Sequence, residues 1–295
     1  MGHVIFIAIP VCLAFLAELI FAGAKNSSLV AFFRRFQTTH LADLACFVAY
    51  GLGFFQTAVF VGSFGVGIIF LWAANALWNG LLLAHRFDPH NAALAAGLYF
   101  VTASFLAYWS HRAFHQGWLW NFHRFHHSAT DMNPLVQHRN HPMQHAITGG
   151  LFALPSLMIK VDPAYIVVLG LIHQTHQLVT HSNIRSDWGW FGRWVLVSPA
   201  AHRLHHSIEV RHHDRNFADD LIIWDRLFGT WCDDSAGVTD LGVTDVAYNH
   251  RGPIYDVLAD YVRAIRQGYM RAKERLIAAV SKVRKAAVNV PPAPC

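Results

Sequence analysis

The chain has 295 residues, of which 54% are hydrophobic and only 14% are charged, and its mean hydropathy is +0.29. Soluble domains carry nearer a quarter of charged residues, so this composition argues against a soluble protein and favours an integral-membrane one. The net charge of +5 is compatible with nucleic-acid binding, but the sequence carries no groove-reading motif and we expect no nucleic-acid partner.

Long segments without Asp, Glu, Lys or Arg indicate membrane-spanning helices, because one crossing needs roughly 20 apolar residues. The first segment resembles an uncleaved anchor, since it lacks a basic start and is long for a signal peptide; a removed signal peptide is the alternative. The predicted fold class is all-α, a polytopic integral-membrane helical bundle with a cytosolic, histidine-rich helical cap. The expected crossings are at about 4–24, 41–61, 66–84, 91–109, 146–159 and 163–180.

Basic residues are concentrated on the segments that also carry most of the histidines. Eighteen of the 23 Lys and Arg lie in 110–145 or 181–295. Because cytoplasmic segments of membrane proteins are enriched in Lys and Arg, we expect these segments to face the cytoplasm. Lys25, Arg34 and Arg35 would then lie on the outer side, which this rule does not explain. The predicted localisation is a multi-pass membrane protein with its metal site on the cytosolic face.

The chain is expected to form one membrane domain in three parts. Residues 1–90 supply the N-terminal transmembrane helices, residues 91–232 form a histidine-rich core with a membrane hairpin, and residues 233–295 form a basic interfacial or cytosolic extension. Within the extension, Lys and Arg alternate with apolar residues from Tyr255 to Lys285. This pattern predicts a surface helix that lies on anionic lipid or on the cap.

Histidine is the unusual residue of this sequence, with 17 of the 21 lying between positions 111 and 250. A related first box, "HRAFH" from His111, has the spacing HxxxH, and the next two boxes, "HRFHH" from His123 and "HRLHH" from His202, share the spacing HxxHH. The third box follows a predicted helix start, with Ser198 as N-cap and Pro199 at the first helical position. Residues three or four apart share one face of a helix, so each box is expected to present its imidazoles together. The eight box histidines are His111, His115, His123, His126, His127, His202, His205 and His206.

Eight imidazoles are too many ligands for one metal ion, and they fit two. Neutral imidazole binds iron, copper and zinc. A structural zinc site needs only four ligands and often includes cysteine, yet the four cysteines of this chain form no Cys-x-x-Cys pair. With neutral ligands alone, a pair of ferrous ions keeps its full positive charge until oxygen or hydroxide binds, which favours an oxidant made from O₂ over hydrolysis. Two iron ions are therefore the favoured interpretation, while ligand type alone leaves zinc and copper open.

These boxes together resemble the fatty acid hydroxylase and sterol desaturase superfamily over about 91–232. Further matching stretches are "HP" at His141, "HSN" at His181 and "WDRLFGTW" from Trp224, whereas Gln144 stands where the family often has Glu. The resemblance implies a non-haem di-iron membrane enzyme that uses O₂ and external electrons to hydroxylate or desaturate a C–H bond of a membrane lipid. It implies the eight box histidines as iron ligands, with His181 and His141 as additional ones. For these last two, a hydrogen-bonded histidine that orients a ligand is the alternative.

The implied cofactors are two non-haem iron ions (Fe²⁺/Fe³⁺), with O₂ as co-substrate. We expect the electrons to come from a ferredoxin or a small cytochrome with its reductase, docked on the basic cap, because no flavin, dinucleotide or b-type cytochrome segment is recognisable. One competing hypothesis is a membrane metal-binding or transport protein, which would keep its polar ligands inside the crossings. Another is a membrane haem protein with paired axial histidines. The sequence leaves open whether the substrate is a sterol, a fatty acyl lipid or a related lipid.

Overall fold

The computed structural model of the chain describes residues 2–54, 87–234, 240–245 and 250–288, together with single positions between them. In this part of the chain every regular element is helical and the extended pairings are isolated bridges, which confirms the predicted all-α class. The elements are α1 (Gly2–Phe21), α2 (Ser28–Arg34), α3 (Thr38–Gly51), α6 (Ala92–Phe114), α7 (Trp120–His127), the 3₁₀ helix η3 (Pro134–His138), α8 (Pro142–Met158), α9 (Pro163–Thr180), α10 (Gly189–Trp194), α11 (Pro199–His205), the 3₁₀ helix η4 (Val210–His212), α12 (Ile223–Leu227) and α13 (Pro253–Val288).

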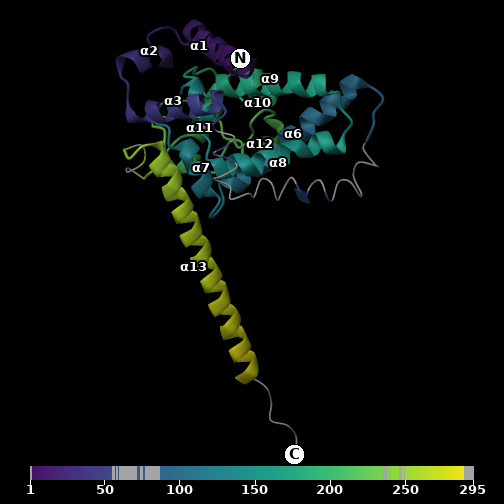
Figure 1. The fold of residues 1–295 in the computed structure, drawn as a ribbon, viewed down its shortest axis with the longest axis vertical. Coiled ribbons are helices and arrows are strands. Elements are labelled where there is room, and N and C mark those ends of the chain that lie inside the picture. The colour runs from purple at the N-terminus through teal and green to yellow at the C-terminus, as the bar shows by residue number, and fades with distance from the viewer. Residues whose placement is uncertain are drawn as a thin grey trace, which may run out of the picture.

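Helices α6, α8 and α9 form the frame that carries the histidine boxes (Figure 1). Helix α6 packs against α8, and α1 packs along α9. A short link at 159–162 joins α8 to α9. Because α6 and α9 end where α8 begins, the segments that follow α6 and α9 meet at one end of the frame, and the short helices α7 and α11 lie there.

The helices that position the boxes begin at recognisable capping residues. Asn91 caps α6 by accepting from the backbone N–H of Leu94 at 3.0 Å. Ser198 caps α11 by accepting from the N–H of Ala201 at 3.2 Å, with Pro199 as the first helical residue. A capping side chain satisfies one of the four free N–H groups of a helix start, and proline costs nothing there because its nitrogen has no hydrogen. The start predicted for the third box is confirmed.

Among the described residues, one helix, α6, is long and apolar enough to cross a membrane by length and composition. It matches the crossing predicted at 91–109 and continues through the first box as far as Phe114. The apolar part of α1, Ile7–Phe21, is shorter, and α3 ends at Gly51. The crossing predicted at 66–84 lies outside the described residues. A multi-pass bundle with a cytosolic cap therefore stays a prediction.

Two buried polar anchors connect the N-terminal helices to the frame. Arg139 and Asp43 are both fully buried, with Nη1 of the arginine 3.0 Å from a carboxylate oxygen of Asp43. The same guanidinium donates to the carbonyl of Phe125, which lies in α7, and to the hydroxyl of Ser128, which directly follows α7. A buried ion pair needs such additional hydrogen bonds, because its ions have lost their water. Asp43 thus ties α3 to the helix that carries the second box.

The second anchor is Glu18, the only formally charged side chain of α1, which is fully buried. Its carboxylate accepts from the backbone N–H and hydroxyl of Ser28 at the start of α2. It also accepts from the backbone N–H of Asn183, two residues after His181, at 2.8 Å. A buried carboxylate is stabilised by hydrogen bonds of this kind. Glu18 therefore holds α1 against the end of α9.

Candidate metal centre

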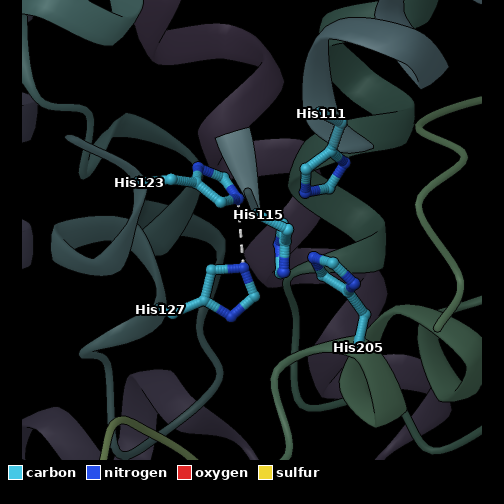
Figure 2. Close-up of side chains that lie close together, drawn as sticks. All are labelled: His111, His115, His123, His127 and His205. Carbon is cyan, nitrogen blue, oxygen red and sulfur yellow. Dashed lines mark hydrogen bonds between the residues drawn. The ribbon is translucent and has the colours of Figure 1, made fainter. Parts of the chain in front are cut away.

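Nine of the ten histidines proposed from the sequence come together in two groups, in each of which the potential ligand atoms lie within 4.8 Å of one another. Figure 2 shows the rings of the first group turned toward one another. The first histidine group is His111, His115, His123, His127 and His205. The second histidine group is His126, His181, His202 and His206.

Each of the two HxxHH boxes divides between the groups, so the boxes do not act as units. In α7, His123 and His127 join the first group while His126 joins the second. In a helix with about 100° per residue, positions i and i+4 lie about 40° apart, whereas i+3 lies about 60° to the other side. The i, i+4 pairs therefore share a group, and the remaining histidine turns to the neighbouring one. The third box repeats this division, with His202 and His206 in the second group and His205 in the first.

The Nε2 atoms of the first group point inward, and three of the five lack hydrogen-bond partners. His111, His115 and His205 each have a buried Nε2 without any hydrogen-bond partner. The Nε2 atoms of His123 and His127 lie 3.1 Å apart (Figure 2). A buried nitrogen without a partner is costly, and convergence of several would destabilise the fold if nothing satisfied them. A metal ion bound by these lone pairs removes that cost.

Hydrogen bonds on the outward side fix the orientation of the rings. Nδ1 of His111 donates to the carbonyl of Phe217 at 2.8 Å, and Nδ1 of His205 donates to the carbonyl of Arg215 at 2.8 Å. Nδ1 of His123 lies 3.0 Å from Oε1 of Gln144. In a neutral imidazole whose Nδ1 carries the hydrogen, the lone pair is on Nε2. The surroundings therefore select the tautomer that turns a ligand atom inward, as the partners of metal-binding histidines do.

The second group is held together by short contacts between Nε2 atoms. Nε2 of His181 lies 3.1 Å from Nε2 of His126 and 2.9 Å from Nε2 of His202, which in turn lies 3.2 Å from Nε2 of His206. Nδ1 of His181 donates to the carbonyl of Gln177 at 2.7 Å, so its Nε2 carries a lone pair. Four nitrogen atoms that converge in this way fit one metal ion. One of them, that of His181, comes from the end of α9, and the other three come from α7 and α11.

Eight of the nine rings lie in surroundings that favour the neutral form. Burial lowers the pKa of His181 to about 4. Burial, with neighbouring imidazoles adding to it, also lowers the pKa well below 6.5 for seven further rings of the two groups. Only a neutral imidazole offers a lone pair to a metal. The donor set of the two groups therefore fits two metal ions of the kind that bind nitrogen ligands.

His141, the tenth predicted histidine, lies outside both groups. Its Nδ1 accepts from the backbone N–H of Met143 at 3.1 Å as the N-cap of α8. Its Nε2 donates to the carbonyl of Val257 in α13 at 3.3 Å, and its ring packs on Phe122 and Tyr261. Both ring nitrogens of His141 are thus used in structural hydrogen bonds, and the structure gives it the position of a helix cap.

Two acidic side chains near the centre, Asp219 and Asp220, were not identified from the sequence. Asp219 lies 3.1 Å from Nδ1 of His111, more than a hundred positions along the chain. Asp220 binds Nδ1 of His173 at 2.7 Å and Nδ1 of His176 at 3.0 Å. Both of these histidines lie in α9, and neither belongs to the two histidine groups. Helical spacing predicts only neighbours within a few residues, so it could not identify hydrogen-bond partners this far apart in the sequence.

Two cavities reach the histidine groups. One of about 300 Å³ lies between α8 and α9 and is lined by histidines of both groups, with Gln137, Asn140, Gln144, Gln174 and Gln177 on its walls. A second, of about 340 Å³, reaches the first group through His115, His127 and His205 and is bordered by Trp120 and Asp214. The first group therefore has access from two directions, through different histidines, and the second group has access from the first cavity.

The sequence region that builds this centre matches a known family. Residues 96–230 match the model of the fatty acid hydroxylase family. The matched segment, a little under half of the chain, is similar to the fatty acid hydroxylase family. It contains all nine histidines of the two groups, whereas α1 to α3 and α13 lie outside it.

Curated proteins are similar to this chain over about half of its length. An alkylglycerol monooxygenase from Xenopus tropicalis is 30% identical over 156 residues, which are 52% of this chain and 34% of that protein. Its counterpart from Homo sapiens is 32% identical over 45% of this chain and 29% of its own length. The ornithine lipid hydroxylase OlsE from Rhizobium tropici is 29% identical over 49% of this chain and 44% of its own length. The chain thus matches less than half the length of each of these relatives, and no solved structure matches it.

Proposed function

We propose that this protein is a membrane non-haem di-iron oxygenase that hydroxylates a C–H bond of a membrane lipid with O₂ and two external electrons. The observation that carries the proposal is the pair of histidine groups, five and four buried or partly buried imidazoles with inward nitrogen atoms. Bound there, two iron ions would supply O₂ activation, in which one oxygen atom enters the C–H bond and the other leaves as water with two electrons and two protons. The nine histidines are the proposed ligands.

The substrate is proposed to be a lipid that reacts close to a polar group. The walls of the cavity between α8 and α9 carry five amide side chains near the histidines, with a volume of about 300 Å³. A site for a plain hydrocarbon chain is lined mainly by apolar residues, whereas amides recognise hydroxyl, ether, ester or amide groups. The names of the relatives, alkylglycerol monooxygenase and ornithine lipid hydroxylase, refer to lipids with such groups. This favours hydroxylation near the headgroup over desaturation of an acyl chain.

The surface of the frame supports a position in the membrane. Large apolar side chains are exposed on α1 and α9, among them Leu13, Leu16, Val168 and Ile172. Contiguous exposed apolar surface of this kind is rare in soluble monomers and is covered by lipid in membrane proteins. We propose that residues 1–90 and the hairpin of α8 and α9 contribute membrane segments beside α6, and that the histidine groups face the cytoplasm.

The second cavity is the proposed side for electron delivery. The ring of Trp120 lies 5.0 Å from the ring of His115 and 5.2 Å from that of His127, centroid to centroid, and borders this cavity. A ferredoxin or small cytochrome that docked on this side would approach the first group without entering the cavity between α8 and α9. Substrate and electron donor would then use different faces of the centre.

The test uses the full chain, purified in nanodiscs, reconstituted with ferrous iron and supplied with a ferredoxin or cytochrome reductase system. Metal content is measured together with product mass for an alkylglycerol, an ornithine lipid and a free fatty acid under ¹⁸O₂. We expect two iron ions per chain, and we expect a polar-headgroup lipid to give a product with one labelled oxygen atom. A His126→Ala variant should lack the full iron content and form no such product. Tightly bound zinc with no oxygenated lipid, or metal transport across proteoliposomes, would overturn the proposal.

A further inference from the structure

Helix α13 leaves the body of the protein after its first turns. Asp256, Asp260 and Ala264 are buried, and the ring of Tyr261 packs on Phe122 and His141. From residue 269 to residue 281, every side chain is exposed. Figure 1 shows this part of α13 projecting away from the other helices. The helix has 36 residues, and this uninterrupted exposed run takes up 13 of them.

A continuous apolar line runs along the side of α13 that faces away from the body. At about 100° per residue its members fall within about 80° of one another. Five of them are 58–67% exposed: Leu258, Val262, Ile265, Tyr269 and Leu276. Ala272 and Val280 continue the line, and from Leu258 to Val280 it extends about 33 Å at 1.5 Å per residue. Exposed apolar surface of this length marks a binding face.

Basic side chains border the apolar line on both sides. Arg266 and Lys273 follow one edge, and Arg275 lies on the other. From residue 261 to 288 there are eight Lys or Arg and a single acid, Glu274, which gives a net charge of +7. An apolar strip with basic flanks matches the boundary of an anionic bilayer, where the apolar residues enter the acyl region and the cations meet phosphate groups.

We propose that α13 lies flat on an anionic membrane surface, with the line from Leu258 to Val280 inserted among the lipids. A second copy of the chain is a poorer occupant, because two such helices side by side would bring their basic flanks together without acidic partners. The direction of α13 agrees with the membrane surface. Figure 1 shows its axis running crosswise to α8 and α9 at the end of the frame that carries the histidines. The inference uses the proposed membrane location but not the oxygenase activity.

The experiment places a fluorophore sensitive to polarity at single cysteines in the full chain, after Cys12, Cys46, Cys232 and Cys295 are replaced by serine. Leu276→Cys reports on the apolar line, and Ser281→Cys, about 140° around the helix, is the matched control. The protein is studied in nanodiscs of a zwitterionic lipid, alone or mixed with an anionic lipid. In anionic discs we expect quenching by aqueous iodide to be about fivefold weaker at Leu276→Cys than at Ser281→Cys.

Neutralising the flanks separates lipid contact from other causes. In a Lys273→Gln, Arg275→Gln background, the shielding of Leu276→Cys in anionic discs should fall toward the level in zwitterionic discs. Equal quenching at both positions in anionic discs would overturn the inference. So would shielding that is indifferent to lipid charge and disappears when each disc holds a single chain, because that result assigns the apolar line to a second copy. Incorporation into discs and iron content, measured on the same samples, report separately on the proposed function.

Discussion

The Nε2 atoms of His181 and His202 lie 2.9 Å apart, although the two residues belong to different helical segments. His181 is the residue that ends α9, and His202 lies in α11. The contact joins the stretch "HSN" to the third histidine box and completes the second group. Its consequence is that the end of α9 and the histidine boxes build one centre together.

Replacement of His181 by alanine should remove one metal ion and leave the other. The second group would retain His126, His202 and His206, while the first group keeps all five histidines. We expect iron to fall from two ions to about one per chain and product formation to fall to background, because O₂ reduction requires both ions. Metal analysis with Mössbauer spectroscopy checks this. Two fully occupied iron sites in His181→Ala would contradict the assignment of His181 as a ligand.

Replacement of His141 by alanine should leave the iron content unchanged and lower stability. The variant loses the cap of α8 and the hydrogen bond to Val257. Loss of a capping side chain costs about 1–2 kcal/mol in the free energy of unfolding. The thermal midpoint of the detergent-purified protein, measured with its iron content, distinguishes this structural role from ligation. Loss of one iron ion would show that His141 is a ligand after all.

Gln144 is expected to act on the first group through His123. Its Oε1 accepts from Nδ1 of that ring, which keeps the lone pair on Nε2. Loss of such a partner lowers metal affinity about 10–100-fold in known sites, so Gln144→Leu should require correspondingly more free iron for half occupancy. Gln144→Glu retains an acceptor and should rescue binding. If Gln144→Leu binds iron as tightly as the parent protein, the hydrogen bond has no positioning role.

Replacement of Asp43 by alanine should be strongly destabilising. The change leaves the fully buried guanidinium of Arg139 without its carboxylate partner. Removal of one member of a buried ion pair costs about 3–5 kcal/mol. The matched control is Asp88→Ala, which breaks the exposed pair with Lys160 and should change the thermal midpoint little. Equal changes in the thermal midpoint for the two substitutions would show that burial of the Arg139–Asp43 pair does not determine its contribution to stability.

The parts of this fold that the sequence predicts are those encoded locally. Ser198 and Pro199 predict the start of α11 because the capping residue and the proline both belong to its first turn. The apolar run that becomes α6 is visible for the same reason, since length and composition decide it. The three boxes are visible because helical spacing repeats within five residues.

The arrangement of the nine histidines depends on contacts between distant segments. Such contacts could not be predicted from the sequence. Helical spacing predicts that His123, His126 and His127 lie near one another, but their division between two groups depends on where α11 and the end of α9 pack against α7. The carboxylate of Asp219 reaches His111 from more than a hundred residues away. The N-cap position of His141 depends on the backbone N–H of Met143, which occupies its Nδ1 and is not visible from histidine spacing.

Glu18 sets a limit on how far this protein can be trimmed. The family match begins at residue 96, yet the carboxylate of Glu18 accepts from the backbone of Asn183, immediately beyond His181. A fragment cut to the matched region would leave that N–H without a partner and remove the support of α1 from the end of α9. The smallest piece expected to keep both histidine groups in place is therefore larger than the segment that matches the family.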